Sequence, residues 1–206
     1  MKWTVSLRIQ DVTPDEVLAE YAAIRASVDR VTAASDRAFS KAEGQRAARL
    51  IAGKGWKAAL RSEDILPMVS DLALHEPGPN GHRAYDRFLA GPAMRMDAAD
   101  LNVAQRMGTS RFSIFRVVGC HEAAGVWVED IMDGKRRLWL MDRGLERTAS
   151  EGFIFAMRVL DAGRFHVSMF SISDFPAFAA DMLAHDMNLR GSSLAVAICR
   201  VQCAIS

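Results

Sequence analysis

The main change in the spacing of hydrophobic residues along this chain falls near residue 110. Residues 3–9 alternate apolar with polar side chains, which is the period of a half-buried strand. From residue 13 to residue 107 the apolar residues instead recur every three or four positions, which predicts helices. From Arg111 onward the alternating period returns. The chain is therefore expected to hold a helical N-terminal half followed by a sheet.

Polar residues with capping chemistry indicate where the helices begin. The motif TPDE at residues 13–16 combines an N-cap hydroxyl, a proline at the first helical position and a glutamate three residues after the cap. Such a motif satisfies two helix-terminal amides reciprocally, so it predicts a helix start. Ser35 is expected to cap a second helix, and Ser62 a third helix that runs toward His75.

The segment HEPGPNGH, residues 75–82, concentrates two prolines and two glycines in eight residues. This composition is typical of turns and predicts a loop. Two short helices are expected after it, over residues 83–89 and 98–107, because each stretch ends at or near a glycine.

Five short apolar stretches separated by turn residues follow Arg111, at a spacing of roughly ten residues. The predicted strands cover residues 112–118, 125–132, 136–141, 153–160 and 164–172. This spacing is typical of a small antiparallel barrel or a strongly bent sheet. Downstream, Asp174 is expected to cap a helix, and residues 194–204 are expected to form a closing strand.

The predicted fold class is α+β, with a helical N-terminal half packed on a small five-stranded antiparallel barrel or strongly bent sheet. Three regions follow from this prediction: residues 1–110, mainly helical with an N-terminal strand; residues 111–173, the barrel; and residues 174–206, a C-terminal helix and strand. The same pattern is compatible with one integrated domain.

Two tryptophans flank the turn in the stretch GVWVEDIMDGKRRLWLMDRG. If Asp133 and Gly134 form a two-residue type I′ turn, Trp127 pairs with the residue after Trp139, and the two indoles lie on opposite faces. Trp139 is then expected in the core and Trp127 at a surface, with Arg136 as its neighbour along the strand. A register shifted by one residue would exchange the faces, so this prediction depends on the turn type.

Composition narrows the class of protein. The chain has 206 residues, 50% hydrophobic and 25% charged, which is ordinary for a soluble globular protein. Its 26 basic and 25 acidic residues nearly cancel, so no overall field favours a polyanion or an anionic membrane surface. A nucleic-acid site would have to be a local patch.

No signal-peptide pattern opens the sequence, and no segment approaches the roughly 18 apolar residues of a membrane span. We therefore expect a cytoplasmic protein without membrane contact. The three cysteines are an odd number without regular spacing, which argues against a disulfide framework and for a reducing compartment.

Residues 37–61 carry the strongest local charge bias, with seven basic residues and one acid. A basic helix with a tryptophan could grip phosphates and stack a base, giving salt-dependent binding to nucleic acid. The residues available for this role are Arg46, Arg49, Lys54, Trp56 and Lys57. The alternative is a solvated helix face balanced by acidic neighbours, and the near-zero net charge favours this alternative. The Gly-Lys-Gly in the run lacks the other residues of a P-loop.

No metal or cofactor is predicted. On a predicted strand, Cys199 and Cys203 would lie about 13 Å apart, too far for one zinc ion to hold both. The histidines at positions 75, 166 and 185 are possible general bases, but none lies beside a recognised nucleophile motif or oxyanion loop. An enzyme would depend on His185 with Asp181, or on His166.

Residues 65–176 resemble a segment of uncharacterised bacterial proteins that are often found with a zinc-binding SEC-C tail. The resemblance is carried by YDRFLAG, TSRFSIFRVVGC, EDIMDGKRRLWLMDRG and EGFIFAMRVLDAGRFHVSMFS. It implies a shared fold and a bacterial origin, not a reaction. This sequence contains no cysteine-rich tail, so the SEC-C metal site has no counterpart among its residues.

Three function classes follow, in order of preference. The first is a non-enzymatic protein-binding or adaptor protein of the bacterial cytoplasm, with a protein partner at the barrel or the helical half and self-association as a further option. The second is a nucleic-acid-binding protein that uses residues 37–61. The third is an enzyme. A deep pocket lined by converging titratable groups would count against the adaptor.

Overall fold

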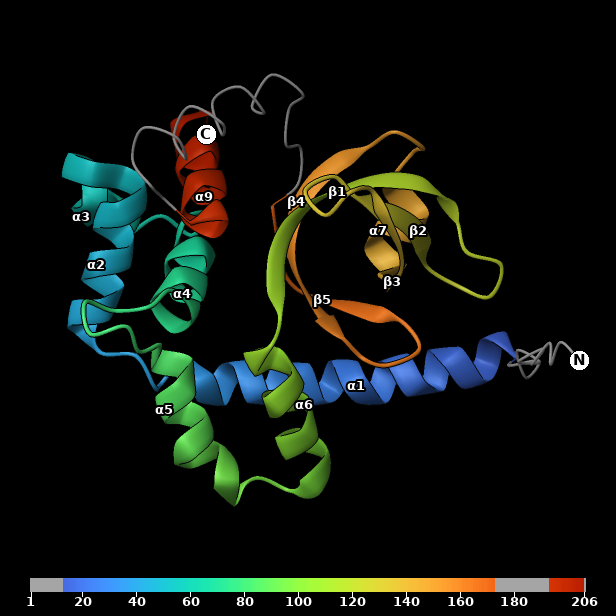
Figure 1. The fold of residues 1–206 in the computed structure, drawn as a ribbon, viewed down its shortest axis with the longest axis horizontal. Coiled ribbons are helices and arrows are strands. Elements are labelled where there is room, and N and C mark those ends of the chain that lie inside the picture. Colours follow the sequence, from blue (N-terminus) through green and yellow to red (C-terminus); the bar gives the residue numbers. More distant parts are fainter. Residues whose placement is uncertain (1–12, 173–192, 206) are drawn as a thin grey trace, which may run out of the picture.

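The computed structural model describes residues 13–172 and 193–205, and it places a group of helices beside a closed five-stranded barrel (Figure 1). The predicted α+β fold class is confirmed. The strand expected over residues 3–9 and the helix expected to begin at Asp174 lie outside the described residues.

Helix α1 (Pro14–Ser35) begins where the capping motif predicts. The Thr13 amide donates to the Glu16 carboxylate at 2.9 Å, and the Thr13 hydroxyl accepts from the Glu16 amide. In Figure 1 this helix passes beneath the barrel and reaches the helical group, so one long element supports both.

The predicted cap of the second helix is wrong by five residues. Helix α2 (Lys41–Ala52) begins after Ser40, whose amide and hydroxyl both bond the Glu43 carboxylate, whereas Ser35 is the last residue of α1. The physical reason is that Ser40 has a glutamate three residues later and Ser35 has an alanine. Only Ser40 can therefore form the reciprocal pair of bonds.

The predicted cap of the third helix is also wrong, because α4 begins at Leu66 with Ile65 at its N-cap and residues 63–65 form a turn after Ser62. The other helices largely follow the sequence pattern. The loop predicted at residues 75–82 separates two of them, and both short helices after it are confirmed. Their bounds, with the short elements, are η1 (Gly53–Gly55), α3 (Trp56–Ala59), α4 (Leu66–His75), α5 (Ala84–Ala90), η2 (Pro92–Arg95), α6 (Ala98–Gly108) and α7 (Arg143–Thr148). The sequence pattern did not predict α7, which begins where the Asp142 carboxylate accepts from two successive amides.

All five predicted strands are present and close into a barrel in the order β1-β2-β3-β5-β4. Their bounds are β1 (Arg111–Cys120), β2 (Val126–Asp130), β3 (Arg136–Met141), β4 (Ile154–Asp161) and β5 (His166–Ile172). The barrel is not wholly antiparallel as predicted, because β3 and β5 pair in parallel. A closed ring with an odd number of strands cannot alternate in direction all the way round, so one parallel pair is unavoidable.

The predicted register of the tryptophan hairpin is wrong by one residue. Trp127 pairs with Trp139, so both indoles lie on the same face. Residues 131–135 form a longer connection than the predicted turn, in which Gly134 and Lys135 both have positive φ, 58° and 63°. The Asp130 carboxylate stabilises this connection by accepting from the amides of residues 132 and 133 at 3.0 and 3.2 Å.

The shifted register exchanges the side chains that fill the barrel. The interior is apolar and is formed by Phe115, Val117, Val126, Val128, Leu138, Leu140, Phe155, Met157 and Val159. Trp127 and Trp139 therefore lie on the outer face, and the prediction that Trp139 is a core residue is wrong because its ring is only half-buried.

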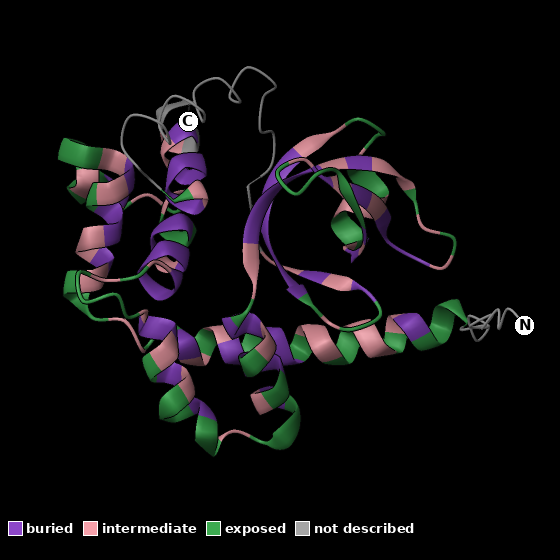
Figure 2. Ribbon diagram, in the orientation of Figure 1, coloured by how far each residue is buried: buried purple, intermediate pink, exposed green. Residues whose placement is uncertain are grey.

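The predicted closing strand is a helix, α9 (Leu194–Ile205). The Ser193 hydroxyl accepts from the Val196 amide at 3.3 Å and starts it. The segment is apolar on nearly all sides, and a continuous apolar run is compatible with either a buried strand or a buried helix. Helices α2 and α4 cover it, so its residues from Ala195 to Cys199 are buried (Figure 2).

Candidate functional site

A cavity of about 440 Å³, called here the junction cavity, lies where α1, α4, α6 and β5 meet. Helix α4 contributes half of its lining residues, and Met107 of α6 and Met169 of β5 add apolar side chains. The cavity thus lies between the helical group and the barrel, a position where ligand sites are common.

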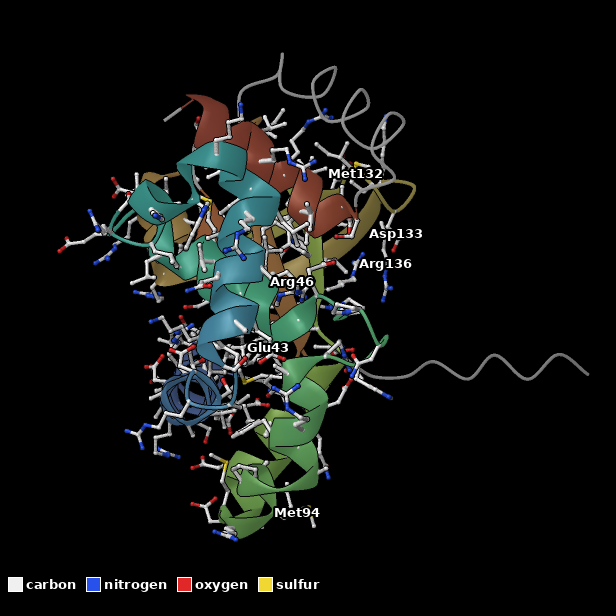
Figure 3. All side chains as sticks on the ribbon, turned by 90° about the vertical axis from the view of Figure 1, so that its left-hand side faces the viewer. Glu43, Arg46, Met94, Met132, Asp133 and Arg136 are labelled. Atoms are coloured by element: carbon white, nitrogen blue, oxygen red, sulfur yellow. The ribbon has the colours of Figure 1, made fainter. Side chains whose placement is uncertain are left out.

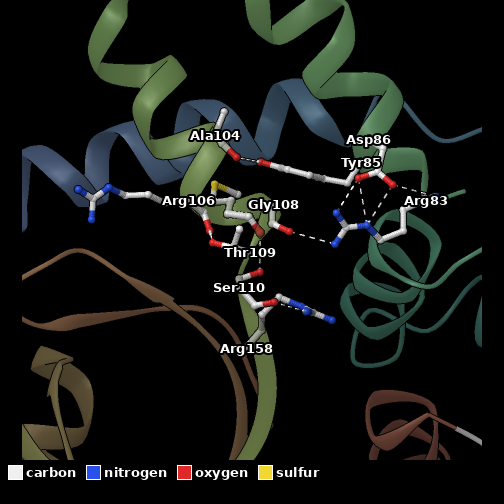
Figure 4. A network of polar contacts seen from close by, with 10 residues as sticks. Arg83, Tyr85, Asp86, Ala104, Arg106, Gly108, Thr109, Ser110 and Arg158 are labelled. Atoms are coloured by element: carbon white, nitrogen blue, oxygen red, sulfur yellow. Dashed lines mark hydrogen bonds and ion pairs between the residues drawn. The ribbon is translucent and has the colours of Figure 1, made fainter.

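A buried ion pair joins the two halves beside this cavity. Arg158 of β4 donates from Nε and Nη2 to the two oxygens of Asp71 on α4, at 2.6 and 2.9 Å, and both side chains are only 6% exposed. Asp71 lines the cavity, and Arg158 also donates to the Ser110 carbonyl at 3.4 Å (Figure 4). Because the bidentate geometry pairs both oxygens of Asp71 with the guanidinium of Arg158, the two side chains neutralise each other.

His75, the last residue of α4, is a buried side chain of the cavity lining with one unpartnered polar atom. Its side chain lines the cavity and is 8% exposed, and its Nδ1 atom bonds to no described residue. Burial, reinforced by the positive charge of Arg158, lowers the pKa of His75 to about 4. The imidazole is therefore neutral at pH 7, and its Nδ1 atom is itself shielded from solvent.

The wall behind His75 is held by a polar network between α5 and α6. The His75 ring stacks on Tyr85 with centroids 4.8 Å apart. The Tyr85 hydroxyl donates to the Ala104 carbonyl at 3.0 Å, and Arg83 pairs with Asp86 and donates to the Gly108 carbonyl (Figure 4). These contacts give the imidazole a fixed orientation.

Two carboxylates belong to the solvent side of the cavity. Asp36 at the end of α1 and Glu63 before α4 line it and are exposed. Neither forms an ion pair with any residue that the structure describes. The site thus combines a largely apolar interior, one neutral imidazole and an acidic entrance.

Several residues of the basic run make contacts within the protein. Arg46 donates to the carbonyls of Glu76 and Pro77, both at 3.1 Å, and so anchors the end of α4 where His75 lies. Arg49 lies over the Trp56 ring at 4.3 Å from its centroid, and Lys57 lies at 5.7 Å from the same ring. Three of the five predicted residues therefore gather at one indole.

Lys54 lies exposed in η1, next to this cluster in the sequence. Two cations already lie near the Trp56 ring, so a base could stack there only by displacing one of them. Binding of nucleic acid by residues 37–61 stays a prediction.

The outer barrel face at Trp127 has a different neighbour from the one predicted. Arg137, not Arg136, lies over the Trp127 ring at 4.6 Å, because side chains alternate along a strand. Arg136 lies at the tip of the hairpin beside Asp133 (Figure 3), 4.0 Å from its carboxylate. The shifted register thus separates the two residues that the sequence placed together.

The two tryptophans are covered in part by a loop of the barrel itself. His121 stacks on Trp139 with ring centroids 3.7 Å apart and approaches Trp127 at 4.7 Å. The Trp139 indole donates to the Ala124 carbonyl at 2.7 Å. The rings of Trp127 and Trp139 and the indole N–H of Trp139 are therefore already in contact with neighbouring residues of the barrel.

Within residues 13–172 and 193–205, no three His, Cys, Asp or Glu side chains lie close enough to hold a metal ion. Cys199 and Cys203 fall on successive turns of α9, so the 13 Å spacing expected of a strand does not apply. Burial raises the pKa of the Cys199 thiol. His185 and Asp181 lie outside the described residues.

Sequence reasoning considered His75 but missed Asp71. The two residues are four positions apart on a predicted helix, which places them on one face, and that spacing was the available signal. Asp36, Glu63, Met107 and Met169 carried no sequence signal, since only the fold brings them together.

No helix in the described ranges is both long and apolar enough to cross a membrane. The comparisons found no match among curated proteins and none among solved structures. A family model described as a family of unknown function (DUF7986) matches residues 15–189, and it brings no link to the SEC-C zinc motif. Because this match covers most of the chain, the protein belongs to that family of unknown function, DUF7986.

Proposed function

We propose that this protein binds a small molecule with a largely apolar body in the junction cavity. The observation that carries the proposal is the cavity itself, a mostly apolar space whose lining includes the buried side chains of Leu74, His75 and Met107. The volume of about 440 Å³ falls within the roughly 300–1,000 Å³ typical of small-molecule sites.

The apolar part of the lining supports such a ligand. The apolar body of a bound molecule would contact the side chains of Leu74, Met107 and Met169. Burial of this surface would supply most of the binding free energy. The ring stacking of His75 on Tyr85 and the ion pair of Asp71 with Arg158 hold two of the walls in place.

The same cavity weakens the adaptor hypothesis. A pocket lined by titratable groups was expected to count against an adaptor. Asp36, Glu63, Asp71 and His75 all line the cavity. By contrast, the cluster around Trp127 is occupied by its own neighbours. A protein partner, self-association and a bacterial cytoplasmic setting remain predictions.

Binding can be tested with octan-1-ol as a neutral probe, followed by chemical shifts of the cavity residues in ¹H–¹⁵N spectra. Ser70→Phe places a ring in the cavity from α4, and Ser150→Phe adds the same ring at an exposed site after α7. We expect saturable shifts in the wild type and in Ser150→Phe, and their loss in Ser70→Phe. Shifts that survive Ser70→Phe would place the probe elsewhere and refute the proposal.

A further inference from the structure

We infer that the ligand of the junction cavity carries a positive charge, as an ammonium group would, at the end that faces solvent. This inference rests on the proposed function and deepens it by naming the chemical class of the ligand: a small apolar body with one cationic head.

The charged side chains in the described lining of the cavity are all acidic. Its lining holds three carboxylates, Asp36, Glu63 and Asp71, and no lysine or arginine among the described residues. Arg158 neutralises Asp71 through the bidentate pair, which leaves the two charges of Asp36 and Glu63. Such a one-signed field concentrates cations and repels carboxylates and phosphates.

Asp36 and Glu63 have no ion-pair partner among the described residues. The same is true of the exposed Asp15, Asp64 and Glu151, but those three do not line the cavity. Elsewhere the chain places arginine beside acid: Asp29 pairs with Arg25 at 2.6 Å, Glu43 with Arg87 at 2.9 Å and Asp100 with Arg30 at 2.7 Å. Within the described part of the chain, no cation fills the corresponding place at Asp36 or Glu63. The charge at this entrance is therefore available to a bound molecule.

The arrangement orients such a molecule. Asp36 and Glu63 are exposed and come from two different elements, whereas Leu74, His75 and Met107 are buried. A cationic head would lie between the carboxylates, and the body would extend toward the buried residues.

The test compares three probes with the same chain: octylammonium, octan-1-ol and octanoate. In NMR titrations of the wild type we expect octylammonium to bind roughly five- to tenfold more tightly than octan-1-ol, since each exposed ion pair contributes little. Octanoate should bind more weakly than octan-1-ol. The preference should shrink as salt is added, because exposed charges are screened.

The matched variants are Asp36→Asn, Glu63→Gln and their double variant, with Glu151→Gln as a control for the loss of one exposed carboxylate elsewhere. The double variant should bind octylammonium and octan-1-ol about equally, while Glu151→Gln keeps the preference. If octan-1-ol binds as tightly as octylammonium in the wild type, or if the preference survives in the double variant, the charge inference is wrong and the apolar site stands. If none of the three probes binds, the proposed function fails, and the inference fails with it.

Discussion

The interior of the barrel and the junction cavity belong to the same fold but differ in the side chains that form them. The barrel interior contains apolar side chains that pack on one another, with the Phe115 and Phe155 rings stacked at a centroid distance of 5.8 Å. The junction holds a buried ion pair, an imidazole with a free nitrogen and open volume. Packing of the barrel interior specifies the fold, whereas the junction keeps open volume and a His75 Nδ1 atom without a hydrogen-bond partner among the described residues.

This difference indicates where function lies in a chain without a recognised motif. A fully packed apolar core stabilises the protein but offers nothing for a ligand to recognise. An interior that keeps volume and a free polar atom loses stability, and such costs are common at functional sites. The comparison can be tested by substitutions whose expected effects differ in size and kind.

The largest expected effect is in the barrel. Phe155→Ala should lower the free energy of unfolding by about 4 kcal/mol, because it removes a fully buried ring and leaves a cavity. Urea denaturation would measure it, with Met132→Ala, exposed at the hairpin tip, as a nearly neutral control. Octan-1-ol should still bind the folded variant. A loss below about 1 kcal/mol would contradict the view that the barrel interior is the rigid region.

The next effect is at the junction. Arg158→Met should cost about 3 kcal/mol, because it leaves the Asp71 carboxylate buried without its partner. Adding Asp71→Leu should restore much of this loss, since removing both charges also removes their desolvation penalty. Arg164→Met, which breaks an exposed pair with Glu20, serves as the control and should cost less than about 1 kcal/mol. An equal loss in the single and double variants would show that shape, not charge, holds the junction.

A third effect depends on pH and comes from His75. Burial is the main cause that lowers the pKa of His75 to about 4, and the positive charges of Arg158 and Arg83 add to this lowering. The negative charges of Asp71 and Asp86 oppose this shift. The unfolded chain therefore takes up a proton near pH 6.5, whereas the folded protein takes it up only near pH 4. Stability should fall as the pH drops through this window, by about 2 kcal/mol between pH 6.5 and 5.

This pH dependence can be assigned to one residue. His75→Leu should flatten the dependence over that window in urea denaturation, while the exposed His82→Gln should keep it. A wild-type slope retained in His75→Leu would mean that other groups carry the proton uptake. The neutral imidazole expected at the junction would then be absent.

The smallest effect is expected on the outer face of the barrel. Trp127→Ala should cost about 1 kcal/mol, because the ring is only half-buried and loses mainly its contacts with Arg137 and His121. It should not change the binding of octan-1-ol to the junction cavity. A loss of probe binding in this variant would break the distinction between the two regions.

Local chemistry explains what could be predicted from the sequence. The capping motif at residues 13–16, the loop at residues 75–82 and the five strands after Arg111 were all confirmed. Each depends on a few neighbouring residues whose hydrogen bonds or backbone angles allow little choice. His75 could also be noticed, although its burial could not.

Tertiary structure decided the features that involve distant residues. The hairpin register depends on how Asp130 and a five-residue connection share hydrogen bonds, and the parallel β3–β5 pair follows only once the ring closes. The apolar C-terminal segment became a helix because α2 and α4 cover it.

The junction cavity was the feature least visible in the sequence. Its walls come from α1, α4, α6 and β5, so neither its volume nor the free nitrogen of His75 exists until these elements pack. The sequence determined which segments could form helices and strands, because those choices are local. Only tertiary packing decided which polar groups are paired and which face the cavity, because pairing depends on neighbours that are remote along the chain.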